Sequence, residues 1–222
     1  MTEPTEETWR RVDRYFADTL VGHDAALEQA VADQNRAGLP HIEVAPVNGK
    51  FLNLLARMSG AERVLEIGTL GGYSTIWLAR ALPEGGRVVT IEAEPANAAV
   101  ARQNLARAGV GDKVDILVGR AEAVLPTLAS EAPFDLVFID ADKESSSLYL
   151  DWAARLGRPG TVVVVDNVGR GGRVADADSS DPGVTGMQRG LRMLGQDPRF
   201  DATALQTLDA KGWDGVAIAL VV

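Results

Sequence analysis

Cysteine is absent from this sequence of 222 residues, and histidine is scarce. The missing thiols exclude disulfide bonds, thiolate metal sites and a cysteine nucleophile. Only His23 and His41 are present, so a histidine-rich zinc site is not expected. No apolar run approaches the roughly 18 residues that a membrane-spanning helix requires. Residues 1–7 are acidic and lack an apolar core, so we expect no signal peptide, and a cytoplasmic location follows as the expectation.

Basic residues are also fewer than acidic ones. The chain has 22 Lys and Arg against 31 Asp and Glu, a net charge of −9. Nucleic acid and anionic membrane surfaces both attract clustered basic residues, so neither is expected as a main partner. The composition is otherwise that of an ordinary globular protein, with 46% hydrophobic and 24% charged residues. We expect one domain that spans residues 1–222.

Helical patterns come before the first predicted strand. Apolar spacing predicts helices within residues 5–37, with a break at Gly22, and over residues 47–58. Residues 1–60 are therefore expected to form an N-terminal helical appendage. The α/β core is expected to occupy residues 61–222.

Strands and helices alternate after that point. The predicted strands cover residues 64–67, 87–92, 114–118, 134–140 and 161–166, with a helix after each of the first four. Residues 162–165 are apolar on both faces, which is typical of a parallel sheet covered on each side by helices. Residues 200–208 and 215–222 predict an antiparallel hairpin at the sheet edge. The expected fold is a doubly wound α/β fold whose seven-stranded sheet is mostly parallel.

One long segment departs from this alternation. Residues 169–186 are rich in Gly, Asp, Ser and Arg and predict a loop, with a helix only over residues 186–194. A loop of that length inside a compact domain is usually functional or mobile. Arg170 and Arg173 are candidates for binding a substrate carboxylate or phosphate, although solvated loop arginines fit the pattern equally well.

A glycine-rich turn follows the first strand. Glu66 replaces the first glycine of the dinucleotide fingerprint and leaves Gly68, Gly71 and Gly72. A carboxylate there would repel a pyrophosphate, which disfavours an NAD-dependent oxidoreductase, but it suits a ligand with an ammonium group. Glu92 closes the second strand, where a carboxylate can accept hydrogen bonds from ribose hydroxyls. Each feature alone also fits a plain turn or a helix cap, but together they indicate S-adenosylmethionine.

A second group of polar residues closes two later strands. Asp140, Asp142 and Lys143 follow the fourth strand, and Asp166 with Asn167 ends the fifth. Carboxylate and carboxamide oxygens are hard ligands that suit Mg²⁺, Mn²⁺ or Ca²⁺. The alternative is that Asp166 and Asn167 cap the following turn while Asp142 and Lys143 form a surface ion pair.

Three motifs occur in an order and separation that resemble a known family. They are residues 64–68 with 72–74, residues 134–143, and residues 166–168. The chain resembles the cation-dependent class I O-methyltransferases, which include the caffeoyl-CoA and catechol O-methyltransferases. The resemblance implies a Rossmann-like methyltransferase fold, S-adenosylmethionine as methyl donor, a divalent metal such as Mg²⁺, and a homodimer.

The resemblance also implies roles for single residues. Lys143 would lie beside the reacting hydroxyl as a general base, together with Asp140 as the other catalytic residue. The metal ligands would be Asp140, Asp166 and Asn167. The cofactor-binding residues would be Val44, Glu66, Gly68, Gly72, Ser74, Glu92, Ala121, Glu122 and Asp140.

The predicted activity is metal-dependent methylation of a hydroxyl on a catechol-like small molecule that carries two neighbouring hydroxyls. The same chemistry on a non-aromatic natural-product hydroxyl is one alternative. A non-catalytic module that binds S-adenosylmethionine is another, but such a module has no need of Asp140, Asp166, Asn167 and Lys143.

Overall fold

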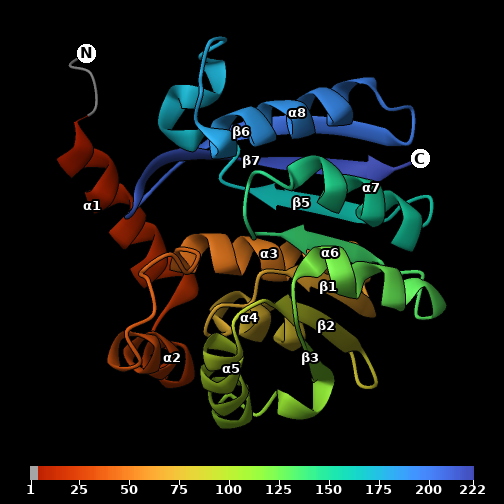
Figure 1. The fold of residues 1–222 in the computed structure, drawn as a ribbon. Coiled ribbons are helices and arrows are strands. Elements are labelled where there is room, and N and C mark those ends of the chain that lie inside the picture. Colours follow the sequence, from red (N-terminus) through yellow and green to blue (C-terminus); the bar gives the residue numbers. More distant parts are fainter. Residues whose placement is uncertain (1–4) are drawn as a thin grey trace.

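A seven-stranded sheet forms the centre of the molecule in the computed structural model, which describes residues 5–222 (Figure 1). The predictions made for residues 1–4 lie outside this range. The strands follow the order β3-β2-β1-β4-β5-β7-β6 across the sheet. They are β1 (Arg63–Ile67), β2 (Arg87–Glu92), β3 (Val114–Val118), β4 (Leu136–Ile139), β5 (Val162–Asp166), β6 (Phe200–Asp209) and β7 (Gly212–Val221).

The sheet is parallel except at one edge. β1 pairs in parallel with both β2 and β4, and β7 runs antiparallel between β5 and β6. The predicted seven-stranded, mostly parallel sheet with a C-terminal antiparallel hairpin is therefore confirmed. The chain runs outward from β1 through β2 to β3 and then crosses back to β4 on the other side of β1. Such folds bind ligands in the crevice beyond the carboxyl ends of the strands at this switch point.

Helices cover both faces of the sheet. One apolar core joins the sheet to α6, α7 and α8, and a second joins its other face to α2, α3, α4 and α5. This two-sided cover confirms the doubly wound architecture. The helices are α1 (Glu6–Phe16), α2 (Ala25–Arg36), α3 (Pro46–Met58), α4 (Tyr73–Ala81), α5 (Pro95–Arg107), α6 (Ala121–Val124), α7 (Ser146–Leu156) and α8 (Pro182–Gln196).

The N-terminal helices begin where capping residues predict. The Thr5 side chain accepts a hydrogen bond at the start of α1, and the Asp24 side chain accepts two at the start of α2. α1 also reaches the β6–β7 hairpin, where Asp13 accepts the backbone N–H of Ala210 at 2.9 Å. The single-domain organisation, with its division at residue 60, remains a prediction.

The predicted loop over residues 169–186 is too long. A short 3-10 segment spans Arg170–Ala175, and α8 already begins at Pro182. Asp181 caps α8 by accepting the N–H groups of Gly183 and Val184. Proline fits the first turn of a helix and aspartate fits the cap, but the glycines around them obscure that signal. None of the helices in residues 5–222 has both the length and the apolarity for crossing a bilayer.

Candidate active site

A cavity of about 730 Å³ lies beyond the carboxyl ends of β1, β2 and β4. Most residues predicted to bind a cofactor or metal line it, whereas Glu66, Gly72 and Asp166 do not. The predicted residues that line it are Val44, Gly68, Ser74, Glu92, Ala121, Glu122, Asp140, Lys143 and Asn167. Segments far apart in the sequence therefore meet at one cavity.

Glycine is required at two positions of the turn after β1. Gly68 has φ +103°, and a Cβ there would lie 2.4 Å from the carbonyl oxygen of Asp140. Gly72 begins α4 with φ +83°, a conformation that side chains disfavour. The turn can therefore pass directly beside the end of β4, which brings Asp140 to the cavity wall.

Glu66 is entirely buried behind that wall. Its carboxylate accepts hydrogen bonds from the hydroxyls of Ser74 at 2.6 Å, Thr75 at 2.5 Å and Thr90 at 2.6 Å. Burial raises the pKa of Glu66 to about 7, because desolvation outweighs the three hydroxyl donors. Ser74 lines the cavity, so one hydroxyl group separates Glu66 from a ligand. Direct contact between Glu66 and an ammonium group remains a prediction.

Glu92 ties the glycine turn to β2. One carboxylate oxygen accepts the N–H groups of Leu70 at 2.7 Å and Thr69 at 3.3 Å. The other accepts the N–H of Glu94 at 2.9 Å and the Asn97 side chain at 3.2 Å. Since a carboxylate has about four acceptor positions, ribose hydroxyls would have to compete for the longer contacts. The ribose contact of Glu92 therefore remains a prediction.

Helix α2 supplies a wall of the cavity that the sequence motifs did not indicate. Gln34 lines the cavity, and its side-chain oxygen accepts the N–H of Gly71 at 3.2 Å. Its Nε2 group is buried and has no hydrogen-bond partner in residues 5–222. The only sequence signal for this segment was helical spacing, which cannot show which residue faces a ligand.

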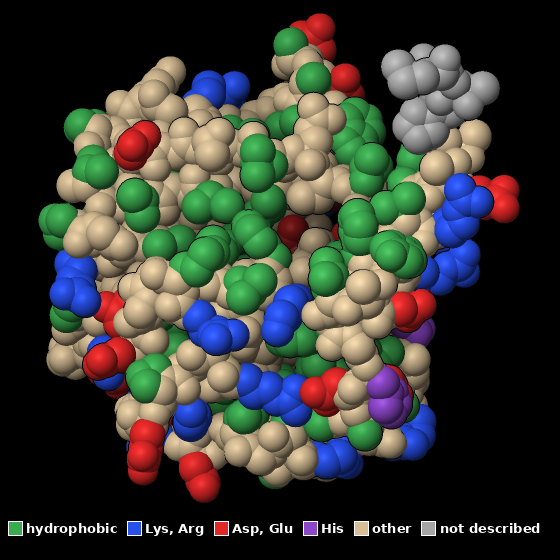
Figure 2. Space-filling model, turned by 180° about the vertical axis from the view of Figure 1, so that it is seen from behind, with side chains coloured by type: hydrophobic (Ala, Val, Ile, Leu, Met, Phe, Trp, Pro, Cys, Tyr) green, Lys and Arg blue, Asp and Glu red, His purple; other side chains and the backbone are tan. Residues whose placement is uncertain are grey.

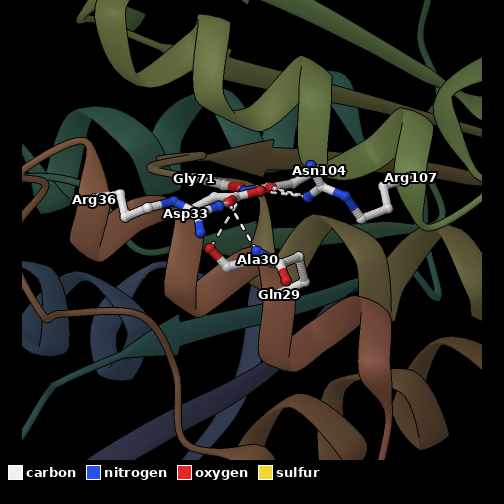
Figure 3. Close-up of polar contacts among 7 residues, drawn as sticks. All are labelled: Gln29, Ala30, Asp33, Arg36, Gly71, Asn104 and Arg107. Atoms are coloured by element: carbon white, nitrogen blue, oxygen red, sulfur yellow. Dashed lines mark hydrogen bonds and ion pairs between the residues drawn. The ribbon is translucent and has the colours of Figure 1, made fainter.

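A polar network fastens α2 to the core (Figure 3). Asn104 on α5 donates to the carbonyl of Gly71 at 2.9 Å and to that of Ala30 at 3.4 Å. Asp33 on α2 is buried and forms ion pairs with Arg107 of α5 and Arg36 of α2. The network holds α2, the glycine turn and α5 together and so keeps Gln34 at the cavity.

A lysine and two aspartates lie together at the ends of β4 and β5. Lys143 Nζ donates to Asp140 Oδ1 at 2.8 Å, and the lysine side chain is only 9% exposed. Lys143 therefore pairs with Asp140, whereas the Asp142 carboxylate accepts hydrogen bonds from the Tyr149 hydroxyl and the N–H of Ser145. Burial and the neighbouring Asp140 carboxylate raise the pKa of Asp166 to about 7.

The donor set of Asp140, Asp166 and Asn167 fits a hard divalent cation. Two mutually repelling carboxylates are stabilised by a positive ion, and the carboxamide adds a neutral oxygen. Asn167 has φ +57°, which asparagine tolerates better than most residues. Residues 5–222 contain no group of three His, Cys, Asp or Glu that could hold a metal ion, and the candidate set here has two carboxylates with the Asn167 carboxamide as its third member.

The candidate metal ligands lie between two cavities. Asp140 and Asn167 line the large cavity, while Asp166 lines a second one of about 290 Å³. Its other walls are mainly apolar and come from α3, the sheet and β6, with Phe51, Phe138, Leu205 and Val216 among them. A ligand held at this point therefore meets polar groups on one side and apolar groups on the other.

Asp214 on β7 positions the turn after β5 and was also missed from the sequence. Its Oδ1 accepts the N–H groups of Gly169 at 2.8 Å and Arg170 at 3.0 Å. These bonds fix the turn that carries Asn167 and Arg170, both of which line the large cavity. The contact joins residues 45 positions apart, and no local pattern in the sequence indicates it.

The comparisons with known proteins agree on one family. The O-methyltransferase family model matches residues 18–218. A catechol O-methyltransferase of Mycobacterium tuberculosis is 57% identical over 210 residues, 95% of this chain and 94% of that protein. A catechol O-methyltransferase of Niastella koreensis is 48% identical over 217 residues, 97% of this chain and 98% of the relative.

Solved structures show the same fold. The O-methyltransferase from Bacillus cereus, in complex with SAH, has a TM-score of 0.96 and 48% identity and covers 98% of this chain and 100% of its own. The O-methyltransferase TomG from Streptomyces achromogenes, in complex with SAM, has a TM-score of 0.95 and 50% identity, with 100% of both chains covered.

Proposed function

The chain belongs to the O-methyltransferase family, and on that premise we propose that it methylates a hydroxyl of a catechol-like small molecule, with S-adenosylmethionine as donor and a divalent metal as cofactor. One observation carries the proposal. The glycine turn with Ser74 and the Asp140–Lys143 pair with Asn167 line the same cavity. Donor and acceptor groups can therefore meet within one enclosed space.

The donor half of the site is built from the ends of β1, β2 and β3. Gly68 lets the turn pass beside the backbone of Asp140, and Ser74 presents a hydroxyl that Glu66 orients. Ala121 and Glu122 line the cavity after β3, where they would flank an adenine ring. S-adenosylmethionine supplies an electrophilic methyl group on a sulfonium. The bound SAH and SAM in the two solved relatives support this assignment.

The acceptor half uses the ends of β4 and β5. Asp140, Asp166 and Asn167 would hold a divalent cation, whose chemistry is to stabilise a deprotonated oxygen of the acceptor. Lys143 Nζ is nearly buried and held at 2.8 Å by Asp140. Lys143 would lose its ammonium proton more readily beside a divalent cation, and the neutral amine would then accept the hydroxyl proton. The rigid placement of these groups would align the oxygen with the methyl group, which is the main contribution of the protein.

The acceptor class rests on two arguments. Two relatives that cover almost the whole chain are catechol O-methyltransferases. In addition, three protein ligands leave coordination positions of a divalent cation for two neighbouring oxygens. A non-aromatic acceptor with the same oxygen pair remains the alternative, and the assay below separates the two.

The test is transfer of a labelled methyl group to a panel of acceptors in the presence of Mg²⁺. Catechol should be methylated, while phenol and guaiacol, which lack a free vicinal pair, should react at least about 100-fold more slowly. A non-aromatic vicinal diol tests the alternative. Equal rates with phenol and catechol would disprove the requirement for two neighbouring hydroxyls.

The proposal includes a homodimer in the cytoplasm. Hydrophobic side chains gather on the face in Figure 2, around a central hollow and toward the flank where α1 lies. The exposed apolar residues there are Tyr15 and Phe16 of α1, Leu20 just after it, and Leu208 and Trp213 of the hairpin. Patches of this kind often mark protein contacts. Light scattering of the purified protein measures the mass of the assembly, and cell fractionation tests the location.

A further inference from the structure

Three cationic side chains line the large cavity, and they differ in their partners. Arg120 pairs with Glu122 at 2.8 Å, and Lys143 pairs with Asp140 at 2.8 Å. Arg170 also lines the cavity, but no carboxylate of residues 5–222 lies within ion-pair distance of it. Its buried Nε likewise has no acceptor in that part of the chain. Within residues 5–222 the Arg170 guanidinium thus has no ion-pair partner, and it is available to bind an anionic ligand.

The conformation of Arg170 is unfavourable for an arginine. Its φ is +53°, in the left-handed region where glycine or asparagine would be less strained. The Asp214 carboxylate holds the backbone there through the Arg170 N–H at 3.0 Å. Strained positions of this kind are often found at functional sites. The backbone conformation does not favour arginine at this position, and its side chain lines the cavity, which makes that side chain a candidate for binding a ligand.

The side chains of Arg170 and Lys143 both approach the start of α8. A Cβ placed on Gly183, at the start of α8, would lie 3.6 Å from Arg170 Nη2 and 3.9 Å from Lys143 Cβ. The two cationic side chains therefore flank the same point of α8. The nearest atom to this point is Asp181 Oδ1, at 3.2 Å, and the Asp181 carboxylate pairs with Arg173. The Lys143 amine reaches Asp140.

From this arrangement we propose that the acceptor is an anionic catechol, with a carboxylate on its ring or on a short side chain that Arg170 binds. This inference rests on the proposed function. Arginine binds carboxylates through two parallel hydrogen bonds. The two hydroxyls lie at Asp140, Asp166 and Asn167, and the carboxylate points toward the turn after β5.

The remaining charges on the cavity wall make Arg170 the place for such an anion. Glu43, Asp142 and Glu144 also line the cavity and are acidic, so they repel a carboxylate. An acceptor with an acid group is therefore directed into one orientation. The distance between the carboxylate and the hydroxyl pair then determines which of the two hydroxyls lies next to Lys143.

The experiment compares protocatechuate, a catechol with a ring carboxylate, with its neutral carboxamide of nearly the same shape. The wild-type protein should favour the acid in kcat/KM by about tenfold or more. Arg170→Met should lower kcat/KM for the acid by about 30-fold and change the value for the amide less than threefold. Arg170→Lys keeps the charge but not the paired donors, so its kcat/KM for the acid should lie between those of the wild type and Arg170→Met.

Arg173→Met is the matched control, because Arg173 lies in the same segment and pairs with Asp181 outside the cavity wall. Arg173→Met should lower kcat/KM for the acid and for the amide by similar small factors. If Arg170→Met lost kcat/KM equally for the acid and the amide, the inference would be overturned. A wild-type protein without preference for the acid would overturn it as well. Failure of the wild type to methylate either substrate or catechol would instead disprove the proposed function, and the inference with it.

Discussion

Glu66 is a carboxylate without access to water, bound by three hydroxyl groups from β2 and α4. Burial raises its pKa to about 7, from an ordinary value of 4.5. Between pH 4.5 and about 7, Glu66 keeps its proton in the folded protein and releases it in the unfolded chain. The stabilising contribution is therefore complete below about pH 4.5 and is lost as the pH rises through about 7.

Replacing Glu66 with glutamine should remove this pH dependence. Between pH 4.5 and 8, the free energy of unfolding of the wild type should fall by about 3 kcal/mol relative to that of Glu66→Gln. Urea unfolding at a series of pH values measures the difference. Glu84→Gln, a change at an exposed turn residue, should follow the wild type, and parallel curves for wild type and Glu66→Gln would refute this account of Glu66.

Single residues show how far sequence reasoning reaches. The motif residues Asp140, Lys143 and Asn167 could be predicted because their types, order and spacing resemble a family. The structure adds what spacing cannot encode, such as the pairing of Lys143 with Asp140 rather than Asp142. Gln34 and Asp214 could not be predicted, because their contacts join distant segments and depend on side-chain direction.

At the scale of elements, the packing of α2 against the glycine turn shapes the proposed donor half of the cavity. A Cβ at Gly71 would lie 2.2 Å from Cγ of Gln34. The backbone of Gly71 is outside the left-handed region, so alanine is excluded there only by this contact. α2 would have to move to accept even one methyl group, although the network in Figure 3 resists such a shift.

Gly71→Ala should therefore lower the free energy of unfolding by about 1–3 kcal/mol. It should also weaken S-adenosylmethionine binding, because Gln34 and the glycine turn shift together. Gly195→Ala is the control, since a Cβ at Gly195 on α8 meets nothing within 4 Å. Thermal unfolding and titration calorimetry report the two effects, and a Gly71→Ala variant as stable as Gly195→Ala would contradict the packing argument.

The elements themselves were largely predictable. Parallel strands such as β2 and β3 begin and end where the apolar runs predict. The start of α8 was not predictable, because Asp181 and Pro182 lie among residues that usually form loops. The strand order across the sheet follows from pairing between distant segments, which the doubly wound pattern anticipates only in general terms.

At the scale of the whole molecule, the account depends on two half-sites that share one cavity. The turn after β1 and the end of β2 form the proposed donor half, and the ends of β4 and β5 form the proposed acceptor half. Neither half is sufficient alone, since methyl transfer requires the donor methyl and the acceptor oxygen in line. The central claim is that Asp140, Asp166 and Asn167 hold a cation that activates the acceptor in this cavity.

The most direct test is the rate of methyl transfer from S-adenosylmethionine to catechol with Mg²⁺, after chelation, and after Mg²⁺ is restored. Chelation should lower the wild-type rate by about 100-fold or more, and restored Mg²⁺ should recover it. Asp166→Ala should lose activity under all three conditions while its affinity for S-adenosylhomocysteine stays within about threefold of wild type. Transfer that is indifferent to chelation, or an Asp166→Ala variant that loses cofactor affinity but keeps its metal response, would contradict the account.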